Sequence, residues 1–140
     1  MEIRVDPGDK APPSRQIVER VLDRIAAGLL VPGDRLPSVR GLAAEALVNP
    51  NTVGKAYREL EALGAVEGRN GTGVFVTERG PEIARDERRG QTLDRLREAV
   101  EAAVAAGHDP VTLDARVDRW LAAAARARLS LVPRNGGLRP

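Results

Sequence analysis

The sequence predicts a mainly α-helical fold that carries one small β-hairpin. Only three of its 140 residues are aromatic, so the core has to be built from Leu, Val, Ile and Ala, which favours helices packed on helices. Apolar residues recur at helical spacing in five segments of the chain. Between the third and fourth segments, two short valine-containing runs flank the stretch GRNGTG, a pattern typical of a hairpin turn.

The first predicted helix spans residues 14–29. Ser14 follows a proline and suits the N-cap position, and Gly28 suits the C-terminal stop. The apolar stripe that we expect to face the core consists of Ile17, Val21, Ile25 and Leu29.

Two further helices follow in quick succession. The second covers residues 39–46, with Ser38 as its N-cap. The third begins at the N-cap Asn49 with Pro50 at its first helical position, where the missing amide hydrogen costs no hydrogen bond, and Gly64 ends it. Its inward-facing positions are predicted to be Val53, Ala56, Tyr57, Leu60 and Leu63.

The remaining chain divides into a hairpin, a charged segment and two helices. The hairpin is predicted over residues 65–77, and the charged, Pro- and Gly-containing segment 79–90 is predicted to be a linker. Helical spacing then covers residues 91–106 and 110–128, which together form the expected C-terminal region 91–128. The tail 129–140 is expected to be disordered.

The second and third helices, joined by a very short turn, describe a helix-turn-helix. In that unit the second helix enters the major groove of DNA, and its leading residues meet base edges. Asn51 can pair with adenine, Thr52 can bond a phosphate or touch a thymine methyl, and Lys55 can reach a phosphate or a guanine. The free amides and partial positive charge of the helix N-terminus also suit phosphate oxygens.

The net charge of +2 does not by itself indicate an acidic partner, so the positive groups would have to gather on one face. Arg35 and Arg40 flank the second helix, and Arg69 lies beside the hairpin tip. With the glycine-rich hairpin they define a winged helix-turn-helix with a basic rim. The alternative for each of these residues is an ordinary solvated side chain on the surface.

The ordered elements PGDRLPSVR, NPNTV, AYRELEALG and GTGVFV resemble the DNA-binding domain of the GntR family of bacterial transcription regulators. The resemblance covers residues 11–78. NPNTV, followed by a short two-helix C-terminal region, is similar to the YtrA-like subfamily in particular. The resemblance implies an N-terminal winged helix-turn-helix domain over residues 11–78 and a C-terminal helical hairpin for dimerisation.

The family pattern also implies which residues contact DNA. By position these are Arg35, Ser38, Arg40, Pro50, Asn51, Thr52, Lys55, Arg58, Arg69, Asn70, Gly71 and Thr72. The sequence departs from the pattern at two glycines. Gly41 stands where the family usually has Glu, so the capping box is missing. Gly54 lies inside the recognition helix, where it costs about 1 kcal/mol relative to Ala, and one hypothesis is that it lets the helix lie closer to DNA.

The two C-terminal helices are too small to enclose a drug-sized ligand alone, so their apolar faces are expected to be buried in a homodimer. Trp120 is the largest candidate anchor. The alternative is that Trp120 packs on the DNA-binding domain of its own chain. The predicted dimer interface consists of Leu93, Leu96, Val100, Val104, Leu113, Val117, Trp120 and Leu121.

These features predict a sequence-specific transcription regulator, a dimeric repressor on a palindromic double-stranded DNA operator. The alternative is a winged helix that binds a partner protein without reading bases. An enzyme is not expected, because the chain has no cysteine and one histidine, His108, and neither catalytic residues, a metal nor a cofactor is predicted. A small-molecule effector is compatible with the sequence but not required. The apolar runs are too short to cross a membrane, and we expect a cytoplasmic protein without a membrane partner.

Overall fold

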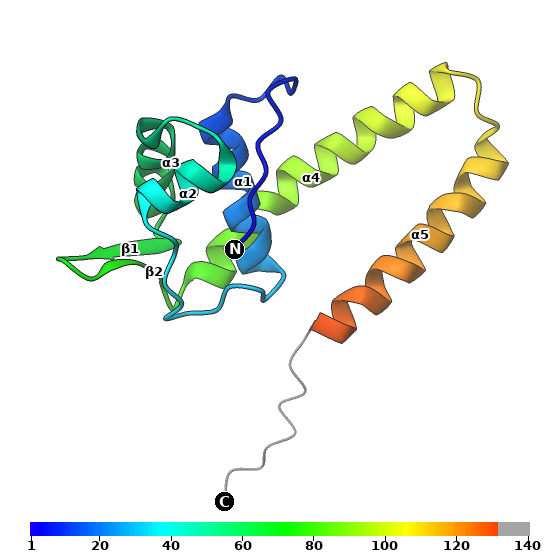
Figure 1. Ribbon diagram of the computed structural model, residues 1–140. Helices are drawn as coiled ribbons and strands as arrows, with labels where there is room; N and C mark the ends of the chain where they lie inside the picture. Colours follow the sequence, from blue (N-terminus) through cyan, green and yellow to red (C-terminus); the bar gives the residue numbers. More distant parts are fainter. Residues whose placement is uncertain (132–140) are drawn as a thin grey trace, which may run out of the picture. The chain divides into compact units, whose positions relative to one another are not determined.

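The computed structural model describes the backbone of residues 1–131 and the side chains of residues 1–128 (Figure 1). It divides into an N-terminal unit, Met1–Arg89, and a C-terminal unit that begins at Gly90. The predicted mainly helical fold with one small hairpin is confirmed. The elements are α1 (Pro13–Ala26), α2 (Val39–Ala46), α3 (Pro50–Leu63), β1 (Val66–Arg69), β2 (Gly73–Val76), α4 (Gly80–Ala105) and α5 (Pro110–Leu131).

The core of the N-terminal unit is aliphatic, as the shortage of aromatic residues predicts. Helix α1 packs against α3, and α2 packs against the same helix. The fully buried side chains include Ile17, Val21, Leu22, Ile25, Leu42, Val53 and Leu60. Each fully buried Leu or Ile of this kind contributes about 1.5–3 kcal/mol relative to an exposed one.

The expected bounds of the first helix need correction at both ends. Helix α1 starts at Pro13, and its N-cap residue Pro12 offers no side-chain cap, so Ser14 lies inside the first turn rather than capping it. The helix ends at Ala26, three residues earlier than predicted. Leu29 therefore lies outside the helical stripe, and 53% of its surface is exposed.

The ends of α2 and α3 follow the predicted capping chemistry. Ser38 Oγ accepts a hydrogen bond of 3.0 Å from the Gly41 amide, and Asn49 Oδ1 accepts one of 2.8 Å from the Asn51 amide. Each bond satisfies an amide that has no partner within the helix. Gly64 ends α3 in the left-handed region at φ 84°, which glycine adopts without a steric penalty.

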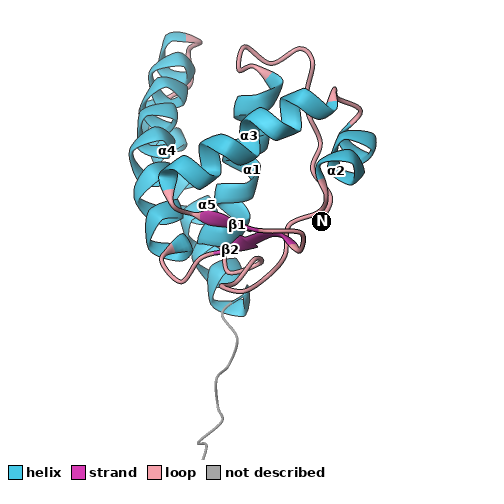
Figure 2. Ribbon diagram, turned by 90° about the vertical axis from the view of Figure 1, so that its left-hand side faces the viewer, coloured by secondary structure: helices cyan, strands magenta, loops and turns pink. Residues whose placement is uncertain are grey.

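The hairpin is antiparallel and is held by a third extended segment (Figure 2). Val66 pairs with Val76 at its base, and Arg69 pairs with Gly73 near its tip. Residues 33–36 run along the other edge of β2, where the Leu36 amide donates to the Val74 carbonyl at 2.8 Å. The segment before α2 and the hairpin are therefore fixed to one another.

Residues 79–90, predicted as a linker, are helical from Gly80 onward. Helix α4 begins there and continues without a break through the predicted helix 91–106 as far as Ala105. Its first turns bury Gly80, Ala84 and Arg88, which recur every four residues on one face. A Cβ at Gly80 would lie 2.9 Å from the Ala65 carbonyl oxygen, so only glycine allows this approach. Tertiary packing thus overrides the charged, loop-like composition.

Arg88 ends this packed stretch with ion pairs to α1. Its Nε donates to Asp23 Oδ1 at 2.7 Å, and its Nη1 lies 3.6 Å from Glu19 Oε1. Glu19 also contacts Arg15, and Arg15 Nη1 lies 2.7 Å from Glu59 Oε1 on α3. A chain of charged groups therefore connects α4, α1 and α3.

The first ten residues also belong to the N-terminal unit, although the predicted domain starts at residue 11. Ile3 is 1% exposed and lies in the core. The Gln16 amide holds this segment, because its oxygen accepts from the Asp6 amide at 2.8 Å and its nitrogen donates to the carbonyl oxygens of Asp6 and Ala11. The domain limits 11–78 and 91–128 otherwise stay predictions.

The C-terminal unit consists of the second part of α4, a short turn and α5. Asp109 caps α5, since its carboxylate accepts from the amide and the hydroxyl of Thr112 at 3.0 and 2.9 Å. Helix α5 extends to Leu131, so the first three residues of the predicted tail 129–140 are helical, and the rest lies outside the described residues. None of the described helices is both long and apolar enough to span a bilayer.

Candidate nucleic-acid interface

Helices α2 and α3 and the hairpin lie on the same side of the N-terminal unit, from which the hairpin projects (Figures 1 and 2). Tyr57 locks α3 to the segment before α2, because its hydroxyl donates to the Pro37 carbonyl at 2.8 Å. Burial raises the pKa of the Tyr57 phenol above its usual value, and the carboxylate of Glu45 adds to the shift. The side chain therefore stays a neutral hydrogen-bond donor.

The leading end of α3 is polar and open to solvent. Pro50, Asn51 and Lys55 are exposed, and Thr52 is half-buried, while Val53 on the opposite face is buried in the core. Asn49 supplies the capping oxygen for this end, and the Asn51 side chain makes no hydrogen bond within residues 1–128. Its amide is free to offer one donor and one acceptor to a partner.

Four of the predicted cationic residues lie in α2, in α3 or in the segment before α2. Arg35, Arg40, Lys55 and Arg58 are all exposed, and among the described side chains none of them forms an ion pair. Their charge is thus not neutralised within the unit, which suits an anionic partner.

The fifth cationic residue, Arg69, is partly neutralised. Its Nη2 lies 3.1 Å from Glu67 Oε1, and its guanidinium lies over the Phe75 ring at 4.5 Å from the ring centroid. Glu67 and Arg69 are two residues apart on β1 and so point to the same face of the hairpin. This alternation was visible in the sequence and could have revealed the pair.

The Arg35 side chain lies beside the tip end of the hairpin. Its backbone bridges to Phe75, and a Cβ at Gly73 would lie 2.6 Å from Arg35 Nε. Gly73 has φ +123°, a backbone conformation that favours glycine. The Arg35 guanidinium is therefore placed next to the first residue of β2.

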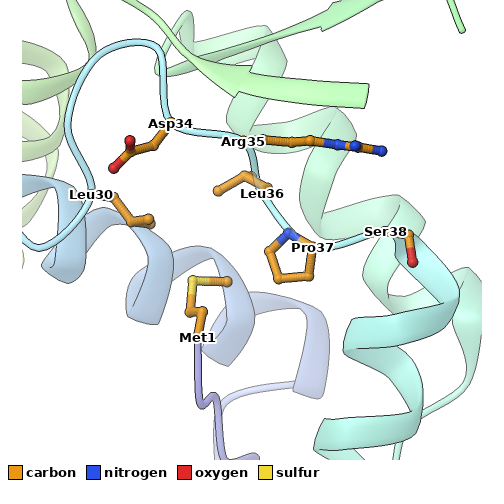
Figure 3. A pocket seen from close by; sticks show the side chains of 7 residues that line it. All are labelled: Met1, Leu30, Asp34, Arg35, Leu36, Pro37 and Ser38. Atoms are coloured by element: carbon orange, nitrogen blue, oxygen red, sulfur yellow. The ribbon is translucent and has the colours of Figure 1, made fainter. Parts of the chain in front are cut away.

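A shallow depression of about 580 Å³ lies beside Arg35 (Figure 3). The polar side chains that line it do not point towards a common centre. Figure 3 shows Arg35 and Asp34 pointing in different directions, and the Asp34 carboxylate accepts from the Val31 amide at 2.9 Å. The seven lining residues are Met1, Leu30, Asp34, Arg35, Leu36, Pro37 and Ser38.

The hairpin tip is a tight, exposed turn. The amide and the hydroxyl of Thr72 both donate to the Arg69 carbonyl, at 3.0 and 3.2 Å. Gly71 takes a left-handed conformation with φ +72°, and Asn70 beside it is exposed. These residues form the projecting tip of the hairpin.

The predicted dimer residues all lie in the C-terminal unit. Trp120 is 60% exposed, whereas Leu113 and Val117 are half-buried. The other exposed members are Leu93, Leu96, Val100, Val104 and Leu121. The predicted dimer interface stays a prediction, and most of its members are exposed in the chain described.

His108 lies in the turn between α4 and α5. Within the described part of the chain, no three His, Cys, Asp or Glu side chains gather as potential metal ligands.

Comparison with known proteins identifies relatives of the N-terminal unit. Residues 13–76 match the family described as bacterial regulatory proteins, gntR family. The HTH-type transcriptional repressor YtrA of Bacillus subtilis is 43% identical over 76 residues, which cover 54% of this chain and 58% of that protein. The chain thus matches little more than half the length of this relative.

Two solved structures share more of their length with the chain. A GntR family transcriptional regulator from Listeria monocytogenes has a TM-score of 0.62 and 31% identity, covering 79% of this chain and 96% of its own. YtrA from Sulfolobus acidocaldarius, a GntR-family transcription factor, has a TM-score of 0.55 and 34% identity, covering 69% of this chain and 98% of its own.

Proposed function

This chain belongs to the GntR family of bacterial regulatory proteins, and we propose that it is a DNA-binding transcription regulator that acts as a homodimer on a palindromic operator. One observation carries the proposal. The leading end of α3 exposes an Asn51 side chain that makes no hydrogen bond within residues 1–128, and Arg35, Arg40, Lys55 and Arg58 are exposed without ion pairs. Helix α3 lies on the side of the unit from which the wing projects (Figure 1). The family membership agrees with the expectation that the chain is not an enzyme.

In the proposed complex, α3 enters the major groove with its N-terminus first. Asn51 donates to adenine N7 and accepts from adenine N6 through one flat amide, a pairing that thymine and the other bases cannot reproduce. Lys55 and Arg40 neutralise phosphates at the groove edge, and Thr52 adds a hydroxyl contact. Phosphate contacts set the position of the helix, and Asn51 supplies sequence discrimination.

The wing makes the second set of contacts. Asn70, Gly71 and Thr72 approach the minor groove, where the small Gly71 allows close contact with the backbone. The Arg35 side chain lies beside Gly73, near the tip of the wing, and neutralises a phosphate there. Arg69 contributes less than a free arginine, because Glu67 shares its charge. Ser38 and Pro50 complete the proposed contact surface.

A second copy of the chain is proposed to cover the apolar face of the C-terminal unit. The exposed apolar side chains of α4 and α5, with Trp120 as the largest, are the ones that this contact would bury. A dimer places two α3 helices on a two-fold axis, so the operator is expected to be palindromic.

Repression is the proposed mode of action. A dimer bound over a promoter excludes RNA polymerase by occupancy alone, and the relative from Bacillus subtilis is named as a repressor. This mechanism needs neither a cofactor nor an effector. Because operator DNA lies in the bacterial cytoplasm, we place the protein there.

The proposal is tested by enrichment of full-length protein on a pool of random DNA duplexes. Wild type is expected to select a two-fold palindrome, and Asn51→Ala is expected to select the same palindrome with one base position relaxed in each half. Ala62→Ser on the exposed side of α3, away from its leading end, is the control. If wild type enriches no sequence, the winged helix does not read bases, and a protein-binding role takes the place of the proposal.

A further inference from the structure

Gly54 and the guanidinium of Arg58 lie next to one another on α3. A Cβ built on Gly54 would lie 3.4 Å from Arg58 Nη1. Helical side chains lean towards the N-terminus, so the side chain at 58 extends back over the residue one turn earlier. The Arg58 guanidinium therefore lies alongside Gly54, next to the turn that carries Asn51.

The space beside position 54 is open because no long side chain fills it, since a Cβ alone would only touch the guanidinium at van der Waals distance. Glycine inside a helix is unfavourable relative to alanine, so helix stability gives no reason for it here. Its φ is not in the left-handed region, so the backbone does not require it either. A long side chain at 54 would occupy the volume that the guanidinium fills, and Arg58 would have to point elsewhere.

Arg58 also carries an uncommitted charge. It is exposed, and within residues 1–128 it makes neither a hydrogen bond nor an ion pair. The nearby carboxylates are engaged elsewhere, because Glu59 pairs with Arg15 at 2.7 Å and Glu61 accepts from the Gly68 amide at 3.0 Å. The five donors of the guanidinium are thus open to a partner.

We propose that Gly54 seats the guanidinium of Arg58 so that it reads a guanine in the major groove, adjacent to the adenine proposed for Asn51. This inference rests on the proposed function and adds a second specificity-determining residue. The leading turns of α3 are the part that reaches base edges. Leaning back over Gly54 brings the guanidinium towards them, and its two parallel donors match O6 and N7 of guanine.

The test uses the palindrome enriched by wild type and its set of single-base variants, with binding of the full chain followed by fluorescence anisotropy. Arg58→Ala is expected to lose discrimination at one G·C position per half-site, by about 5- to 150-fold. Gly54→Leu is expected to lose discrimination at the same position, because leucine displaces the guanidinium. In the Arg58→Ala background, Gly54→Leu should cause no additional loss, since both changes remove one contact.

Matched controls separate this role from helix stability. Gly90→Ala also replaces a helical glycine, in this case an exposed one with nothing within 4 Å of its Cβ, and should leave discrimination unchanged. Arg58→Lys keeps the charge but loses the bidentate fork, so it should behave like Arg58→Ala at the guanine. Circular dichroism confirms that each variant is folded.

Two results would overturn the inference while leaving the proposed function intact. In the first, Arg58→Ala weakens binding equally for every base variant, and Arg58 then contacts a phosphate and not a base. In the second, Gly54→Leu keeps wild-type discrimination, and the residue at position 54 then does not determine where the Arg58 guanidinium lies. In both cases Asn51→Ala still relaxes its own position. If wild type itself shows no base preference, the proposed function and this inference fail together.

Discussion

Leu47 occupies a backbone conformation that L-amino acids avoid, and replacing it with glycine should stabilise the N-terminal unit. It ends α2 with φ 56° and ψ 46°, and among the described residues it is the only non-glycine with positive φ. This conformation costs about 1–2 kcal/mol for a residue with a Cβ. The side chain is 90% exposed, so its removal forfeits almost no burial.

The gain is partly offset in the unfolded chain, where glycine has more freedom by about 0.4–1 kcal/mol. The net stabilisation expected for Leu47→Gly is therefore about 0.5–1 kcal/mol. For a unit of this size that corresponds to a rise in Tm of about 2–8 °C.

Thermal unfolding followed by circular dichroism measures this shift in the full chain. Leu29→Gly is the matched control, because Leu29 is also exposed but does not have positive φ. The control should be neutral or destabilising, since glycine at position 29 only raises the conformational entropy of the unfolded chain. A Leu47→Gly variant that melts at or below the wild-type temperature would refute the assignment of strain to this turn.

Three further changes test the packing around α3 and α4. Tyr57→Phe should cost about 0.5–1.5 kcal/mol near neutral pH, because the Pro37 carbonyl loses its donor. The raised pKa of Tyr57 also means that wild type loses stability as pH rises above about 10, the unfolded value. The variant should lack this alkaline loss, and the absorbance of the sole tyrosine reports the titration directly. Gly80→Ala should destabilise by about 1–3 kcal/mol in urea unfolding, because its Cβ meets backbone at 2.9 Å. Arg88→Met should cost about 1–3 kcal/mol in the same assay, since Asp23 loses a charged hydrogen bond. Unchanged midpoints for either variant would mean that the first turns of α4 do not hold the unit together.

Local chemistry made the helix-turn-helix predictable. Ser38 and Asn49 cap their helices through side-chain oxygens that bond amides two or three residues away, so the signal lies within a few positions of sequence. Gly64 ends α3 for an equally local reason. The aliphatic stripe of α3 follows from helical spacing alone.

The helical state of residues 80–90 was not predictable in the same way. Its buried face is made of a glycine, an alanine and an arginine, and only the alanine is apolar. Gly80 is explained by its closeness to Ala65 and Val76, and Arg88 by its pairing with Glu19 and with Asp23, which lies 65 positions away in the chain. The burial of the Arg88 charge can be explained only when its carboxylate partners are known.

In the candidate site, too, some features were predictable from local sequence and others depend on the tertiary structure. Asn51, Lys55 and Arg40 follow from the position of the recognition helix and from the family pattern. The contact between Gly54 and Arg58 depends on where one long side chain lies, and no spacing rule specifies that.

The central claim is that the leading end of α3 discriminates between bases. It is tested most directly by the ratio of the affinities of the full chain for its enriched palindrome and for a scrambled duplex of equal length, at one salt concentration. We expect a ratio of about 10³ or more for wild type. We expect a lower ratio for Asn51→Ala, because the loss falls on the palindrome alone at about 1–3 kcal/mol per contact. A wild-type ratio near one, or an Asn51→Ala variant that weakens both duplexes equally, would contradict it.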